Sequence, residues 1–129
     1  MNRGQKYLLF AASGVLAVAL TYGVNPKFML NFLYGMTVSG TDQTHIYRAV
    51  MGLYLGFVAL WIGGALRSSL YQPAMTSLVV FMFGIAIGRA ISLAVDGMPH
   101  WLFVGYLALE IILGSIALYL FQVSQAKPK

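Results

Sequence analysis

Residues 74–95 read AMTSLVVFMFGIAIGRAISLAV, and this stretch decides the fold class. It carries one charged residue, Arg89, in a run of otherwise apolar or weakly polar side chains. Its length is close to the ~20 residues that carry a helix across a ~30 Å hydrocarbon core. Because a backbone in lipid must satisfy its own hydrogen bonds, the stretch predicts a transmembrane helix.

Three similar apolar runs occupy residues 7–24, 45–66 and 101–123. The connections between the last three runs are short, so successive helices are expected to pack side by side in opposite directions. The sequence therefore predicts an all-α integral membrane protein, an antiparallel bundle of four transmembrane helices in a single domain over residues 1–129. A cleaved signal peptide is the alternative interpretation of the first run, which has a basic start and the small residues Ala17-Val18-Ala19.

Turn residues support these limits. Thr41 or Asp42 is expected to cap the second span, and Pro73 to open the third. Asp96-Gly97-Met98-Pro99 is typical of a tight turn. The one long connection contains the apolar stretch 26–34, which predicts a short interfacial helix, with a hydrophobic loop packed on the bundle as the alternative.

The composition agrees with a membrane location. Of 129 residues, 60% are hydrophobic and 9% are charged, against roughly 25% charged in an average soluble domain. The chain has no cysteine, which excludes disulfides and cysteine-ligated metal centres. The net charge of +5 does not indicate nucleic acid, because most of the basic residues flank the apolar runs and they form no patch.

The basic residues also predict an orientation. One set of span ends carries most of them, namely Arg3, Lys6, Arg67, Lys127 and Lys129. By the positive-inside rule, both termini are expected in the cytoplasm, in a multi-pass protein of the bacterial inner membrane.

Ionisable residues inside the spans are the informative feature for function. Arg48, Arg89 and Glu110 all lie within apolar runs, where an arginine at the helix centre costs about 2.5–3.5 kcal/mol on insertion scales. Glu110 comes eleven residues after Pro99, roughly 16 Å along a helix that rises ~1.5 Å per residue. Such residues are expected to face the bundle interior and to find partners.

Helical spacing predicts that polar stripes on the four helices meet in an outward-opening polar cavity, with Glu110 at its floor. On the first span the predicted inward stripe is Ser13, Ala17 and Thr21. The candidate ligand-binding residues are His45, Arg48, Arg89, Ser92, Asp96 and Glu110. Arginine suits a carboxylate or phosphate head group, so the expected ligand is an anionic amphiphile or another membrane lipid. The alternatives are a purely structural ionic network and a path for protons or ions.

Other motifs add little chemistry. The acidic residues and histidines lack a local metal-ligand spacing, so neither a metal nor a cofactor is predicted. The Gly52-x-x-x-Gly56 and Gly84-x-x-x-Gly88 motifs permit close helix approach. They are expected to serve internal packing, with association of two copies as the alternative.

The chain resembles the domain of unknown function 4345 family of small four-helix bacterial membrane proteins. The resemblance is carried by the segments 22–26, 45–49, 52–56, 61–65, 81–99 and 110–114, above all by His45-x-x-Arg48-Ala49 and by Gly88-Arg89-x-x-Ser92-x-x-x-Asp96-Gly97-x-Pro99. It implies four spans and no established activity.

The sequence leaves three functions open. The first is a non-enzymatic binding or accessory protein, which holds an amphiphile or docks on a membrane-protein partner. The second is a small proton- or ion-coupled transporter. The third is an intramembrane enzyme of the isomerase type that uses Glu110, although no nucleophile–base spacing supports catalysis.

Overall fold

The computed structural model describes residues 1–126, which form five α-helices and no strand. The helices are α1 (Arg3–Gly23), α2 (Pro26–Tyr34), α3 (Gly40–Leu66), α4 (Ser68–Asp96) and α5 (Trp101–Gln125). All but α2 are long and apolar enough to cross a membrane. The all-α class and the four predicted spans are thus confirmed, and residues 26–34 form a helix as predicted.

Polar side chains cap the starts of α1 and α2, and a glycine ends α2. The Asn2 side chain accepts from the Gln5 N–H while Gln5 reciprocates, which satisfies free donors at the start of α1. The Asn25 side chain accepts from the Phe28 N–H at the start of α2, with Pro26 as the first helical residue. Gly35, with φ of 65°, ends α2 in the left-handed region that favours glycine.

The predicted start of the third span at Pro73 is wrong. Helix α4 begins at Ser68, only Arg67 separates it from α3, and Pro73 lies inside the helix. Pro73 is exposed and lies near the start of the helix. Proline has no N–H, so one helical hydrogen bond is lost there, but no buried polar group is left without a partner. The predicted cap of the second span is also wrong, because α3 begins at Gly40 after Ser39.

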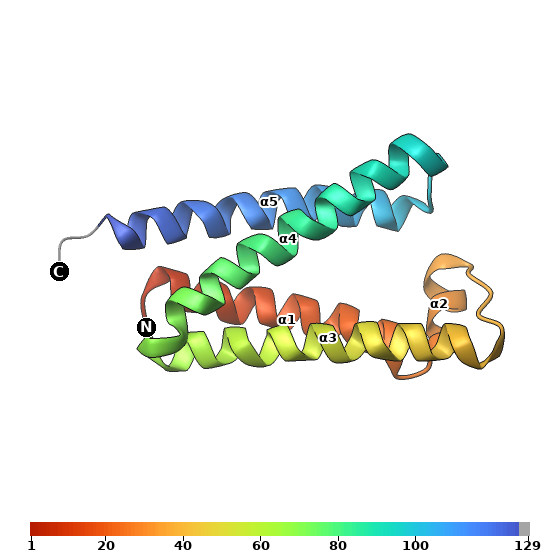
Figure 1. Cartoon of the computed structure of the whole chain (residues 1–129), viewed down its shortest axis with the longest axis horizontal. Coiled ribbons are helices and arrows are strands. Elements are labelled where there is room, and N and C mark those ends of the chain that lie inside the picture. Colours follow the sequence, from red (N-terminus) through yellow and green to blue (C-terminus); the bar gives the residue numbers. More distant parts are fainter. Residues whose placement is uncertain (127–129) are drawn as a thin grey trace.

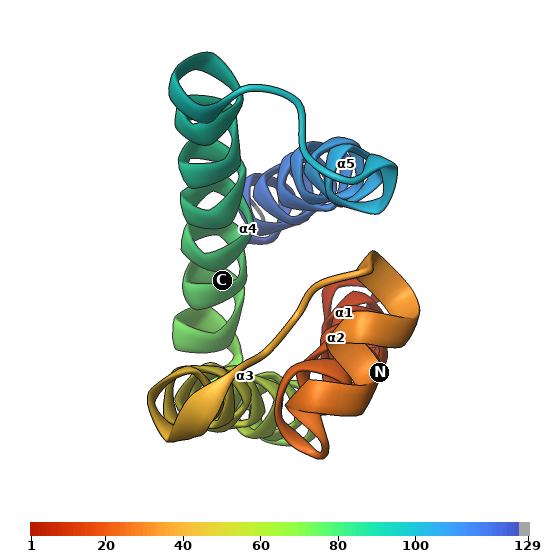
Figure 2. The same ribbon diagram turned by 90° about the vertical axis from the view of Figure 1, so that its right-hand side faces the viewer.

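The helices are arranged around α4. Helices α1 and α3 lie side by side, and α4 runs from the end of α3 to α5 (Figure 1). Viewed along the bundle, α5 packs on α4 and faces α1 and α2 across the open side of the molecule (Figure 2). The N-terminus, the α3–α4 junction and the end of α5 gather at one end, opposite α2 (Figure 1).

The main core lies where α1, α3 and α4 meet. Trp61 is fully buried there, and its indole N–H donates to Ser77 Oγ at 3.0 Å. The Phe81 ring meets the indole edge to face. A smaller cluster of Tyr22, Leu30, Tyr34 and Val38 packs α2 onto the opposite end.

Close helix approach comes from other glycines than predicted. A Cβ at Gly64 would meet the side chain of Ala74, and a Cβ at Gly23 would meet Met51. In the two predicted motifs, at residues 52–56 and 84–88, the glycines are exposed and have open space beside them. Their assignment to internal packing is therefore wrong.

Candidate functional site

An ion pair joins the last third of α4 to the first half of α5. Arg89 Nε donates to both carboxylate oxygens of Glu110, at 3.0 Å each. The two side chains are 21% and 12% exposed, so the pair is only partly buried. Among residues 1–126 no charged side chain is fully buried, which corrects the expectation of a buried ionic network.

Aromatic rings hold the guanidinium in place. Its Cζ lies 5.4 Å from the centre of the Phe103 ring and 5.7 Å from that of Tyr106, both on α5. These distances suit cation–π attraction, which is stronger in desolvated surroundings. Tyr106 comes four residues before Glu110, so both side chains project from the same face of α5.

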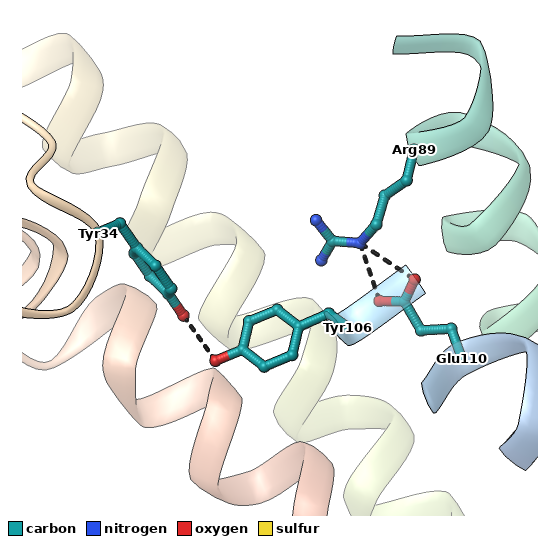
Figure 3. Close-up of polar contacts among 4 residues, drawn as sticks. All are labelled: Tyr34, Arg89, Tyr106 and Glu110. Carbon is teal, nitrogen blue, oxygen red and sulfur yellow. Dashed lines mark hydrogen bonds and ion pairs between the residues drawn. The ribbon is translucent and has the colours of Figure 1, made fainter. Parts of the chain in front are cut away.

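Tyr106 also links α5 to the short helix α2. Its hydroxyl lies 3.0 Å from that of Tyr34 (Figure 3). Burial raises the pKa of Tyr34 above its ordinary value, and the hydrogen bond with Tyr106 raises it further. Tyr34 therefore stays neutral well into the alkaline range and keeps this link between α2 and α5.

A cavity of about 270 Å³ lies between α1 and α5, against the ion pair. Its wall is mostly apolar, with side chains of Tyr54 from α3 and Phe81, Met82 and Ile85 from α4. Arg89, Tyr106 and Glu110 supply its polar part. Four of the lining residues are exposed, which places the mouth between α1 and α5: Phe10, Ser13, Gly14 and Leu109.

Two tyrosine hydrogen bonds bracket this open side. The Tyr7 hydroxyl on α1 donates to the Leu113 carbonyl oxygen on α5 at 2.7 Å. The Tyr34–Tyr106 contact makes the second link, on the far side of the ion pair from Leu113 along α5. The cavity mouth therefore opens in the stretch where α1 and α5 make no such bond to each other.

Of the six candidate ligand-binding residues, the structure places two at the cavity, Arg89 and Glu110. Ser92 Oγ donates to Asp96 at 2.7 Å, and both residues are exposed. His45 and Arg48 are exposed on α3 and line a separate shallow hollow with Lys27. The expected convergence of His45 and Arg48 with Glu110 is therefore not found, and their role in binding stays a prediction.

Sequence reasoning also missed most of the α1 wall of the cavity. The predicted inward stripe of Ser13, Ala17 and Thr21 is wrong as a packed face, because Ser13 and Ala17 are exposed, although Ser13 does line the cavity mouth. The buried stripe of α1 consists of other residues, namely Leu8, Ala11, Ala12, Val15 and Ala19. One signal was present for α5, where the spacing of Tyr106, Glu110 and Gly114 by four residues marks a shared face.

No group of His, Asp or Glu residues within 1–126 has the arrangement of a metal site. The Arg89–Glu110 pair can interact with a ligand through hydrogen bonds and electrostatic attraction. Arg89 offers donors, and Glu110 offers two acceptor oxygens that share the Arg89 Nε–H.

Comparison with known proteins gives one match. The family model described as a domain of unknown function (DUF4345) matches residues 4–121, nearly the whole chain. No curated protein and no solved structure matches.

Proposed function

The chain belongs to the DUF4345 family, and we propose that it is a multi-pass membrane protein that binds an amphiphile in the cavity between α1 and α5. The acyl chain would enter through the mouth formed by exposed residues of the two helices. The head group would lie against Arg89 and Glu110 on the inner wall. The function is binding or accessory rather than enzymatic.

The observation that carries this proposal is a polar pair set in the wall of an otherwise apolar cavity whose mouth lies on the side of the bundle. Ligand sites are mostly apolar with a few placed polar groups, and typical volumes begin near ~300 Å³. A cavity of about 270 Å³ therefore suits a head group and part of a chain rather than a complete lipid.

The membrane arrangement forms part of the proposal. The four long helices cross the bilayer in alternating directions, with both termini in the cytoplasm of a bacterial inner membrane. Helix α2 lies in the outer interface, and the cavity opens toward the acyl chains. The exposed, stacked rings of Phe28 and Phe32 on α2 support this placement, since apolar side chains of an interfacial helix enter the head-group boundary.

Photoaffinity labelling tests the proposal. Probes would be a C18 fatty acid and its methyl ester, each with a diazirine on the chain, added to the protein in nanodiscs. We expect labels on the α1 and α5 segments 10–18 and 106–113. The Gly14→Phe variant fills the cavity, because Gly14 lines it and a Cβ there meets nothing within 4 Å. Labelling of this variant is expected to fall to background.

Gly84→Phe is the matched control. Gly84 also has open space beside it and is exposed, but it lies outside the cavity. Its labelling should equal that of the wild type. Undiminished labelling in Gly14→Phe, or an equal loss in both variants, would contradict binding in this cavity.

A further inference from the structure

The charges that line the cavity cancel. Of its lining residues only Arg89 and Glu110 carry formal charge, one positive and one negative. They form a salt bridge at 3.0 Å. The other basic residues expected at the site, His45 and Arg48, lie in the separate hollow with Lys27. The cavity therefore presents no net charge to a ligand.

The hydrogen-bond donors at the ion pair outnumber the acceptors that they contact. A guanidinium has five N–H donors, and among the described residues only the Nε–H of Arg89 makes hydrogen bonds of ordinary geometry. The two terminal nitrogens point away from the carboxylate (Figure 3). The Tyr22 hydroxyl is a further polar group near the guanidinium. Arg89 thus has further N–H groups that can donate, while both Glu110 oxygens already accept from its Nε–H.

This balance of charge and donors decides which head group fits. An anion would add an unpaired negative charge to a site that is already neutral, within a span where isolated charge is costly. A carbonyl oxygen would accept from the free N–H groups and bring no charge. A hydroxyl would accept in the same way but must also place its own proton, for which the carboxylate keeps only the lone pairs that it does not share with the Arg89 Nε–H.

We infer that the cavity selects an amphiphile with an uncharged carbonyl head, as found in esters and quinones, over an anionic one. The inference rests on the proposed function and revises the anionic ligand that the arginines alone suggest. It names the head group only, because the apolar part of the cavity accepts chains of many kinds.

A series of C18 competitors with the same chain isolates the head group. Methyl oleate, oleate and oleyl alcohol would each compete with the photoreactive methyl ester, at pH 9 so that the acid is ionised. In the wild type we expect methyl oleate to compete about tenfold more strongly than oleate, the ratio that 1.4 kcal/mol produces. Oleyl alcohol should fall between them. Decylubiquinone, compared with methyl oleate, distinguishes a quinone from an ester source.

Variants that change the net charge of the cavity give the decisive test of head-group selection. Glu110→Gln keeps the side-chain shape and leaves Arg89 with a net positive charge, so the preference should reverse and oleate should compete more strongly. The Arg89→Gln/Glu110→Gln double variant restores neutrality, and the preference for methyl oleate should return. Arg67→Gln removes an exposed basic residue outside the cavity and should leave the wild-type ratio unchanged.

The outcomes separate the two proposals. If oleate competes as well as methyl oleate in the wild type, or if Glu110→Gln leaves the ratio unchanged, the selection of a neutral head is overturned while cavity binding stands. If no competitor reduces labelling of segments 10–18 and 106–113, binding in the cavity fails and the inference fails with it.

Discussion

The two sides of α1 differ in how they are packed. Toward α3 and α4, Leu8 and Ala12 are buried, and Leu8 reaches the position a Cβ on Gly64 would approach. Toward α5, Phe10 and Gly14 are exposed and line a cavity. The polar pair thus lies beside the open side of α1, where a ligand can reach it, and the closely packed side of α1 carries no charge.

The largest expected loss of stability comes from a substitution at the closely packed side of α1. Gly64→Ala adds a Cβ that would meet Ala74 and lie 3.0 Å from the Leu70 carbonyl oxygen, where backbone must move. We expect a loss of about 3 kcal/mol in the free energy of unfolding, at the upper end of overpacking in cores. Unfolding in mixed micelles with increasing SDS measures it.

Gly14→Ala is the control for Gly64→Ala. It adds the same methyl group on the open side, where nothing lies within 4 Å. The free energy of unfolding should rise slightly, by up to about 1 kcal/mol, since alanine favours helix over glycine. Equal losses in the two variants would show that α1 is packed alike on both sides.

A smaller effect is expected from truncating large side chains. Leu8→Ala leaves a gap in the main core, where Leu8 is fully buried. The cost should be about 2 kcal/mol, at the low end for such changes, because lipid is as apolar as the core and only the lost packing counts. Phe10→Ala, at a ring 62% exposed on the other side, should cost far less in the same SDS titration. A larger loss from Phe10→Ala would reverse the assignment of the two sides.

The smallest effect concerns the links that bracket the open side. Tyr34→Phe removes the hydrogen bond to Tyr106 and should cost about 1 kcal/mol of unfolding free energy. Tyr7→Phe removes the bond to the Leu113 carbonyl oxygen at the other end and should cost a similar amount. If the links restrict the mouth, both variants should also label faster with the photoreactive ester.

Alkaline pH offers a second measurement on Tyr34. Its pKa is raised in the folded protein, so the folded state holds the phenolic proton more tightly than the unfolded state. This contribution to stability is complete below the ordinary tyrosine pKa of about 10 and is lost as the pH rises above it. The decline should be shallower in Tyr34→Phe, and an unchanged pH profile would contradict the role of this link.

The sequence alone was enough to predict four helices long and apolar enough to cross a membrane. The four apolar runs and the helix at residues 26–34 follow from local hydropathy and from proline and glycine, which act within a few residues. The pairing of Arg89 with Glu110 was also foreseeable, because each is costly to leave alone in a span and each has few partners to choose from.

Tertiary structure decided which face of each helix points inward. The spans are apolar nearly all round, so no stripe of α1 or α3 is set apart by hydropathy. Close packing of small residues such as Ala11 and Gly64 then fixes the rotation, and it turns Ser13 and Arg48 outward. Whether a partner protein or a second copy covers those outward faces stays a prediction of the sequence. The position of the cavity depends on contacts between helices that are distant in the chain, and no local pattern records such contacts.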